Sequence, residues 1–452
     1  MVGGGSAVNG GHAVVLGGSL AGMCAAAALA RHVGRVSLVE RDALPEGPHW
    51  RRGVPQSRHT HNILRGGQNA LEELFPGLRA RLLDAGMAEV RWPDEVRLLL
   101  PTGWLCAYPS DYTIVCGTRP LLDWLLQCRV RELSRVRVLE RTTVLGLTGD
   151  AAAVRGVRAQ TRDASGVAGE PFTLDADFVV DATGRTSRTP SWLAGLGLPA
   201  PAETVVNAGT AYATALFKRP AEPTAPWKSL IVQATPQAPH SAILHPVEDD
   251  RWVVSVAAMG GERPPTDHAG FLEFTRNLRT PLLYETIRDA PLVGEIHGSG
   301  RTENRRRRYE RLSRWPDRFL VLGDAAGCLN PSYGQGVSVA ALCALDLARA
   351  VEAAARGGAD PLTGIASGLR RRVARRIDAA WTVSANTDLV YPWTEGEPDL
   401  AARLGGAYVN RLLRTATTSP AVAQAMTRVS QLDTPAGVLF SPRVLLGALT
   451  GR

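Results

Sequence analysis

The chain has 452 residues, a formal net charge of +8 and a charged fraction of 21%, values of an ordinary globular protein. Only two of its 51 basic residues, Lys218 and Lys228, are lysine, and no basic stripe alternates with stacking aromatic residues, so we expect no nucleic-acid partner. A chain of this length buries a large core and predicts two or three domains, or one large domain with an insertion.

The distribution of the cysteines and the hydropathy of the chain predict its cellular compartment. The six cysteines are scattered without a Cys-x-x-Cys pair, which disfavours a zinc site and a disulfide framework. The N-terminus lacks the basic and apolar regions of a signal peptide, and no run of about 18 apolar residues predicts a membrane span. We therefore expect a cytoplasmic protein with a disordered, glycine-rich segment over residues 1–10.

The first ordered segment predicts a strand, a turn, a helix and a second strand. "HAVVL" (12–16) is short, apolar and followed by glycines, as in a buried strand. "AGMCAAAALARHVG" (21–34) consists of strong helix formers and ends at a glycine. "RVSLVERD" (35–42) reads as the next strand, with Glu40 at its end. This order is that of a βαβ unit.

The rest of the chain changes pattern twice. Residues 42–60 predict a loop, 119–133 an amphipathic helix, and 176–184 a buried strand that ends at a glycine. Between residues 190 and 315, short runs rich in β-branched residues predict an antiparallel or mixed sheet. These runs are "AYATALF" (211–217), "SLIVQAT" (229–235), "SAILHPV" (241–247) and "RWVVSVAA" (251–258). "RFLVLGDA" (318–325) returns to the buried-strand pattern, and long helices follow it.

We predict an α/β fold in three parts. A discontinuous Rossmann-type domain comprises residues 11–80, 116–189 and 316–350. A substrate-binding β-sheet domain comprises residues 81–115 and 190–315, and residues 351–452 form a helical C-terminal region.

The turn in "VVLGGSLAG" (14–22) has the context of a dinucleotide-binding motif, with one departure. Gly17 permits the tight turn and Gly22 lets the helix approach the strand, but Ser19 stands where the motif has its second glycine. Free N–H groups at the helix start favour a pyrophosphate. Glu40 follows about 20 residues later, where an acid accepts ribose hydroxyls, which favours FAD or NAD over NADP.

A second motif, "FLVLGDAAGCLNPSYGQGVSVA" (319–340), also joins a buried strand to a helix. Asp324 stands at the strand end, where a carboxylate binds sugar-like hydroxyls. The loop after Pro331 and the helix start offer N–H donors to an electron-rich ring. Two such motifs some 300 residues apart predict one extended ligand held at both ends.

Both motifs, and "DFVVDATGRTSRTP" (177–190), resemble those of class A flavoprotein monooxygenases of the p-hydroxybenzoate hydroxylase type. The resemblance implies that fold, with non-covalent FAD, NAD(P)H as a transient co-substrate, and O₂. In the family, the aspartate of the second motif binds the ribityl chain, and the loop after it faces the isoalloxazine ring. The third segment carries Asp181, Gly184, Arg185 and Ser187, which the family uses to support FAD and passing NAD(P)H.

Individual positions follow from the resemblance. Arg52 matches an arginine that contacts the flavin nucleotide, Arg119 a ribityl- or phosphate-side contact, and Val144 a backbone contact to adenine. The implied cofactor-binding set is Gly17, Ser19, Gly22, Glu40, Arg41, Arg52, Arg119, Val144, Asp181, Asp324, Pro331, Gly334 and Gly336. No side chain is assigned as catalytic, and the candidates near the ring are Pro331, Gly334, Gln335 and His59.

A narrower resemblance concerns "RRGVPQSRHTHNILRGG" (51–67) and "LPAPAETVVNAGTAYATALFK" (198–218). These segments are similar to bacterial natural-product flavin enzymes that include the lasalocid- and monensin-type polyether epoxidases. The similarity implies antibiotic biosynthesis, in which a flavin C4a-hydroperoxide epoxidises alkenes of a hydrophobic polyketide. We expect the β-branched runs between residues 211 and 258 to line the substrate cavity with apolar side chains.

Other functions stay open at this point. The same fold hydroxylates aromatic polyketides and other phenols, reduces polyprenyl double bonds, or binds flavin without catalysis. A halogenase is disfavoured, because the chain has no WxWxIP stretch and no lysine before Lys218. Only one complete dinucleotide fold is present, so a separate flavin reductase is an alternative source of electrons.

A pair of histidines and a run of four arginines are interpreted as structural features. His59 and His61 alone are too few ligands for a metal site, and we expect no metal. We expect the "RRRR" run (305–308) to be a solvated connection into the next strand.

Overall fold

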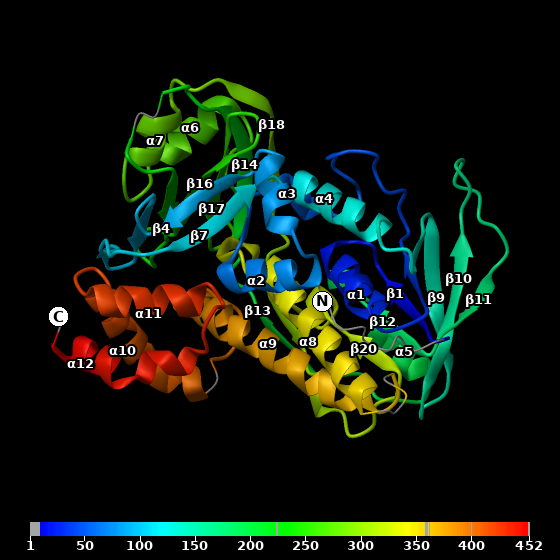
Figure 1. Ribbon diagram of the computed structural model, residues 1–452. Coiled ribbons are helices and arrows are strands. Elements are labelled where there is room, and N and C mark those ends of the chain that lie inside the picture. The colour runs from blue at the N-terminus through cyan, green and yellow to red at the C-terminus, as the bar shows by residue number, and fades with distance from the viewer. Residues whose placement is uncertain (1–9, 223–224, 358–359, 361, 399, 451–452) are drawn as a thin grey trace, which may run out of the picture.

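A computed structural model describes residues 10–222, 225–357, 360, 362–398 and 400–450. The expected disordered segment 1–10 therefore lies outside the described residues except for its last position. The α/β fold class is confirmed (Figure 1). Among the residues described, no helix is long and apolar enough to cross a membrane.

The N-terminal βαβ unit belongs to a five-stranded parallel sheet. Its order is β20-β12-β1-β2-β8, and every neighbouring pair is parallel. The strands are β1 (His12–Leu16), β2 (Arg35–Val39), β8 (Val136–Leu139), β12 (Phe178–Asp181) and β20 (Phe319–Val321). β1 is buried along its whole length, as its continuous apolar sequence predicts for a strand that is covered on both faces.

Helices with small side chains cover this sheet. The alanine-rich helix α1 (Leu20–Ala30) packs against α8 (Gly336–Arg356), and α9 (Ile365–Asp388) packs against α8 in turn. α2 (Arg65–Leu74) and α3 (Leu78–Asp84) are separated at Pro76-Gly77, and α4 (Arg119–Arg131) ends two residues before its predicted end. The strands β9 (Thr142–Gly149), β10 (Val154–Thr161) and β11 (Phe172–Asp175) form a separate antiparallel sheet at the side of the molecule (Figure 1).

A seven-stranded sheet forms the second layer, in the order β18-β14-β17-β16-β15-β5-β6. All neighbouring pairs are antiparallel except β15 with β5, so the predicted antiparallel or mixed sheet is correct. The strands are β5 (Val96–Leu100), β6 (Gly103–Trp104), β14 (Ala211–Lys218), β15 (Ser229–Val232), β16 (His240–Val247), β17 (Arg251–Ala258) and β18 (Leu292–Ser299). One face is buried under α6 (His268–Arg276) and α7 (Leu282–Ile287).

The C-terminal helices cover a third region. A small sheet of β3 (His61–Ile63), β7 (Tyr112–Gly117) and β4 (Ala88–Trp92) lies beside β5. α10 (Leu400–Thr415), α11 (Pro420–Ser430) and α12 (Pro442–Thr450) share a hydrophobic core with β4, β5 and β7. α8 and α9 instead belong to the core of the parallel sheet. Figure 1 shows α10–α12 (red) apart from α1 and β1 (blue).

The arginine run is not a solvated connection, contrary to expectation. Its first three arginines belong to β19 (Asn304–Arg307), which pairs with β13 (Glu203–Val206) and β21 (Gly327–Cys328). Arg306 is only 1% exposed, and its guanidinium lies 3.2 Å from the carboxylate of Asp378 on α9. The run is buried because carboxylates distant in sequence compensate its charge.

Candidate functional site

The glycine-rich turn after β1 requires its glycines. Gly17 has φ of +96°, and a Cβ there would lie 2.7 Å from the carbonyl oxygen of Ala182. A Cβ at Gly22 would lie 1.7 Å from the carbonyl oxygen of Gly17. These clashes explain the two glycines on backbone geometry alone, and the turn delivers the chain to the N-terminus of α1.

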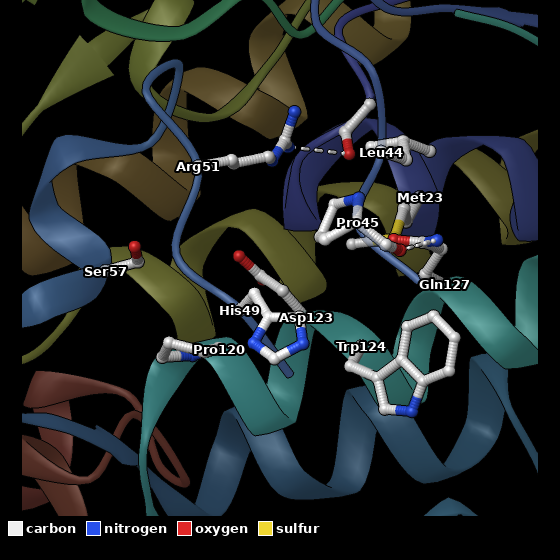
Figure 2. Close-up of a pocket in the computed structure, with 11 residues that line it drawn as sticks. Met23, Leu44, Pro45, His49, Arg51, Ser57, Pro120, Asp123, Trp124 and Gln127 are labelled. Carbon is white, nitrogen blue, oxygen red and sulfur yellow. Dashed lines mark hydrogen bonds between the residues drawn. The ribbon is translucent and has the colours of Figure 1, made fainter. Parts of the chain in front are cut away.

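Glu40 holds this turn from the end of β2. Its carboxylate is buried and accepts hydrogen bonds from the backbone N–H groups of Gly18 at 2.7 Å and Asp42 at 2.9 Å. Arg51 forms an ion pair with the same carboxylate at 3.0 Å and donates to the carbonyl oxygen of Gly18 at 2.9 Å. Figure 2 shows Arg51 on the loop after β2 directed toward the turn, across the pocket from Asp123 and Trp124 of α4.

The arginine that reaches the turn is thus Arg51, whereas the family resemblance implies a cofactor contact for Arg52. Arg52 is exposed, and the side chain of Arg41 is 60% exposed beside Asp42. Neither contacts the turn in this structure. The two adjacent arginines cannot be told apart by sequence, because only the direction of the loop decides which side chain points inward.

Arg119, for which the resemblance implies a contact to FAD, lies against the turn. It is the first residue of α4, is 5% exposed, and pairs with Asp123 at 2.7 Å. Its Nη2 donates to the Ser19 hydroxyl at 3.3 Å. Ser19 is the N-cap of α1 but makes no side-chain capping bond, so its hydroxyl is held mainly by this arginine.

Asp181 is occupied by its own loop. Its buried carboxylate accepts hydrogen bonds from the backbone N–H and hydroxyl of Thr183 and from the hydroxyls of Ser187 and Thr189, at 2.5–2.9 Å. The geometry therefore gives Asp181 a role in shaping the segment after β12. Arg185 in that segment pairs with Glu303 at 2.6 Å, and Val144 lies half-buried on β9.

Asp324 has the properties of a ligand-binding carboxylate. It follows β20 and lies beside the start of α8, where its Oδ1 is 3.9 Å from the position of a Cβ on Gly336. Among the residues described, no side chain or backbone group donates a hydrogen bond to this carboxylate. Burial raises its pKa, and the nearby guanidinium groups of Arg185 and Arg119 oppose that shift. A crowded acceptor without a protein donor fits the hydroxyl groups of a ribityl chain.

The loop between Asp324 and α8 is held by a buried polar network. Asn330, Tyr333 and Asn304 all donate to the carboxylate of Asp388, at 2.6–3.2 Å. Gly334 has φ of +65°, and a Cβ there would lie 2.5 Å from Oδ1 of Asn62 on β3. These contacts fix the loop from both sides.

The start of α8 leaves polar groups free. Gln335 is 2% exposed, and its Oε1 has no hydrogen-bond partner among the residues described. The first N–H groups of a helix also lack intrahelical partners. Pro331 opens the short 3₁₀ turn before Gly334, so the sequence-predicted residues Pro331, Gly334, Gln335 and Gly336 lie together at this end of the site.

His59 lies between the loop after β2 and the seven-stranded sheet. Its Nδ1 is 2.9 Å from the Thr214 hydroxyl, and its ring packs edge-on against Tyr212 at 4.4 Å. Burial, with smaller effects from His297 and Arg58, lowers the pKa of His59 to about 4. The imidazole is therefore neutral at pH 7.

His61 is also neutral. Burial lowers its pKa to about 3, and the charge of Arg119 acts in the same direction. Its Nδ1 lies 2.9 Å from the backbone oxygen of His59. No group of three potential metal ligands occurs within the described part of the chain.

Sequence reasoning missed Arg51, Asn62 and Asp388. Arg51 carried a signal, because it stands in the same loop as the chosen arginine. Asn62 and Asp388 carried none, since each acts on the loop before α8 from a distant segment, and only the fold brings them there.

Comparisons with known proteins agree with this geometry. The family model described as "FAD binding domain" matches residues 12–386. Protein Rv3254 of Mycobacterium tuberculosis is 32% identical over 435 residues, which cover 93% of this chain and 90% of that protein.

Solved structures share the fold at low identity. The flavin-dependent brominase Bmp2 has a TM-score of 0.64 at 16% identity, with 93% of each chain covered. The p-nitrophenol 4-monooxygenase PnpA from Pseudomonas putida has a TM-score of 0.63 at 18% identity, with 93% of this chain and 98% of that chain covered. At these identities the likeness is one of fold.

Proposed function

Since the chain belongs to the FAD binding domain family and is an FAD-dependent monooxygenase by family and fold, we propose that it oxygenates a hydrophobic natural-product intermediate. The reductant in this proposal is NAD(P)H, and the reaction is the epoxidation of alkenes in a polyketide chain. FAD, when bound, supplies the redox and oxygen-activating chemistry.

The residues of the chain divide the binding of FAD between two ends. We assign the ribose hydroxyls to Glu40, the phosphate side to Arg119 and the N-terminus of α1, and the ribityl hydroxyls to Asp324. The unpartnered carboxylate of Asp324 supports this assignment most directly. On binding, the ribose hydroxyls would share the Glu40 carboxylate with Gly18 and Arg51.

The observation that carries the oxygenase proposal is the attachment of the loop before α8 to the seven-stranded sheet. The Asn330 amide donates to the hydroxyl of Thr210 at 3.3 Å, and Thr210 directly precedes β14. On the other side, Gly334 packs against Asn62 of β3. A flavin ring held by this loop would lie beside one face of the sheet, where a substrate can be excluded from water.

Protonation states near the loop favour alkenes over phenols. Hydroxylation of a phenol requires a base that ionises it, whereas epoxidation of an alkene requires none. His59, with its pKa lowered to about 4, is a weak base. Burial beside Asp388 raises the pKa of Tyr333 well above its usual value, so this phenol stays protonated.

The test uses purified holoenzyme with NADPH and ¹⁸O₂. One labelled oxygen atom should enter a candidate polyene, with the loss of one double bond. Turnover of phenols without incorporation into any alkene would contradict epoxidation and leave aromatic hydroxylation in its place. An anaerobic incubation with NADPH, followed at about 450 nm, asks whether the enzyme reduces its own flavin. A flavin that stays oxidised for minutes would require a separate reductase.

A further inference from the structure

One row of side chains crosses the face of the seven-stranded sheet opposite α6 and α7. Residues that pair across neighbouring strands point to the same face. The register places six residues in this row: His297, Thr214, Ser255, Ile243, Ile231 and Leu98. The residues that alternate with them, such as Ala213 and Val254, are buried under α6 and α7.

The first half of the row is polar and uncharged. The hydroxyls of Thr214 and Ser255 are 2.6 Å apart, Ser255 reaches the Thr60 hydroxyl at 2.6 Å, and Thr214 reaches Nδ1 of His59 at 2.9 Å. Burial lowers the pKa values of both His59 and His297, so these groups are neutral at pH 7. No carboxylate or cation takes part in this chain of hydrogen bonds.

A cation lies only at the outer end. Arg58 is exposed, stacks over Trp50 at 4.0 Å, and donates to Nδ1 of His297 at 3.1 Å. Its charge adds to the effect of burial in lowering the pKa values of both imidazoles. A charged headgroup that used this arginine would bind at the surface and leave the hydroxyl chain unused.

The second half of the row is apolar. Ile243, Ile231 and Leu98 are each half-buried, so part of every side chain is free of protein contacts. From Ser255 to Leu98 the row crosses three strand spacings, a span of about 14 Å. Leu98 and Ile231 also border the core that contains the C-terminal helices.

The row lies next to the loop before α8. Thr60 directly precedes β3, whose Asn62 contacts Gly334, and Thr214 lies on β14, whose preceding residue Thr210 bonds Asn330. The polar half is therefore the nearer one to the loop that the proposed function assigns to the reacting ring.

We infer that this row binds an elongated, uncharged substrate, with a hydroxyl or carbonyl oxygen on the half-buried Ser255 hydroxyl, which the buried Thr214 orients, and a hydrocarbon chain along Ile243, Ile231 and Leu98. The inference rests on the proposed function for the identity of the site as a substrate site. The inference goes beyond the proposed function because it names a polar head and an apolar tail of the substrate and the residues that bind each part.

The probes are octanol, decanol and dodecanol, together with decane and decanoate. Binding to the oxidised holoenzyme is followed by the flavin absorption difference spectrum. The Kd of the alcohols should fall by roughly threefold to fourfold for each added methylene until the apolar half is covered. Decanol should bind more tightly than decane and more tightly than decanoate.

Two variants of Ser255 separate chemistry from structure. Ser255→Ala should weaken decanol by about fivefold to tenfold, as the loss of one hydrogen bond predicts, and leave decane unchanged. Ser255→Thr keeps a hydroxyl on a residue that suits a strand, and should restore decanol binding. Ile231→Ala should instead reduce the effect of chain length and affect decane and decanol equally. Flavin content checks that each variant is folded.

The outcomes distinguish this inference from the proposed function. Absence of ¹⁸O transfer, with the expected binding pattern, contradicts the oxygenase proposal and leaves the row as the binding surface. Tighter binding of decanoate, abolished by Arg58→Gln, would overturn the inference in favour of an anionic head. Equal effects of Ser255→Ala on decane and decanol would overturn it as well.

Discussion

At the residue scale, Asp324 should determine how tightly the cofactor is held. Asp324→Ala removes a hydrogen-bond acceptor that no described protein group uses. The substitution should therefore weaken the binding of FAD and not a contact within the protein. We expect FAD affinity to fall by about 1.5–3 kcal/mol, the contribution of hydrogen bonds to a charged group, or roughly tenfold to hundredfold in Kd. Quenching of flavin fluorescence during titration of the apoprotein measures this.

The unfolding free energy of the apoprotein separates an effect on FAD binding from an effect on folding. Burial raises the pKa of Asp324, so the free carboxylate destabilises the apoprotein, and its removal should not lower the unfolding free energy without FAD. Asp289→Ala is the matched control, because its side chain is 87% exposed. Unchanged FAD affinity of Asp324→Ala would refute the assignment.

Ser19 should tolerate glycine. The residue makes no side-chain capping bond, and its hydroxyl has one long contact, with Arg119 at 3.3 Å. Glycine costs an N-cap only a few tenths of a kcal/mol and restores the usual motif. Ser19→Gly should therefore bind FAD at least as tightly as the wild type in the same titration. Tenfold weaker binding would show that the hydroxyl itself contacts the cofactor.

Sequence motifs predicted residues whose role is fixed by local backbone geometry. Gly17 and Gly22 follow from steric limits within one turn, and Glu40 from its place at the end of the next strand. Arg51 did not follow, because the motif specifies a loop and not the direction of each side chain. Asp181 was predicted as a cofactor residue, but its four hydrogen bonds to its own loop could not be counted from sequence.

At the element scale, the end of α9 should make stability depend on pH through Asp388. Burial raises the pKa of this carboxyl, against the lowering effect of hydrogen bonds from Tyr333, Asn330 and Asn304. The native state therefore binds the proton more tightly than the unfolded chain. Stability is lost as pH rises from the unfolded value of about 4 through the native one, by about 1.4 kcal/mol for each unit of elevation.

Asp388→Asn isolates this effect. The asparagine variant does not titrate, so the difference in unfolding free energy, wild type minus variant, should fall as pH rises and then level off. Urea denaturation of both proteins over a pH series measures it. A difference that rises with pH would show that the hydrogen bonds outweigh burial and lower the pKa.

The arginine strand β19 shows where element prediction fails. A run of four cations with only Glu303 and Glu310 as acidic neighbours in sequence favours a solvated segment. In the fold, Glu203 lies on the neighbouring strand β13 and Asp378 on α9, and both compensate the run. The partners lie about 70 to 100 residues away, beyond any pattern that can be recognised locally.

The strands of the seven-stranded sheet illustrate a partial success. Their β-branched composition predicted a sheet correctly, whereas the expectation that their apolar residues line the substrate cavity stays a prediction. The most apolar face is buried under α6 and α7. The opposite face carries the hydroxyls of Thr214 and Ser255 with Ile243. Alternation gives two faces but does not say which one a neighbouring element covers.

At the scale of the whole molecule, the three largest hydrophobic cores of the described residues join segments that are distant in sequence. The core of the parallel sheet extends through α8 and α9 to Ala385, while Leu412 and Val422 belong to the core with β4, β5 and β7. The C-terminal helices thus pack on the strands beside the proposed substrate row and not on the FAD-binding sheet. We expect them to stabilise the substrate side selectively.

Leu412→Ala tests this division. Leu412 is 1% exposed on α10, so its truncation should cost about 2–5 kcal/mol of unfolding free energy. Leu446→Ala on α12 is the control, since that side chain is 63% exposed and should change stability by no more than about 0.5 kcal/mol. Because the FAD-binding core is separate, Leu412→Ala should retain wild-type FAD affinity at temperatures below its unfolding transition, while decanol binding weakens. Parallel loss of FAD and decanol binding would show instead that the cores unfold as one cooperative unit.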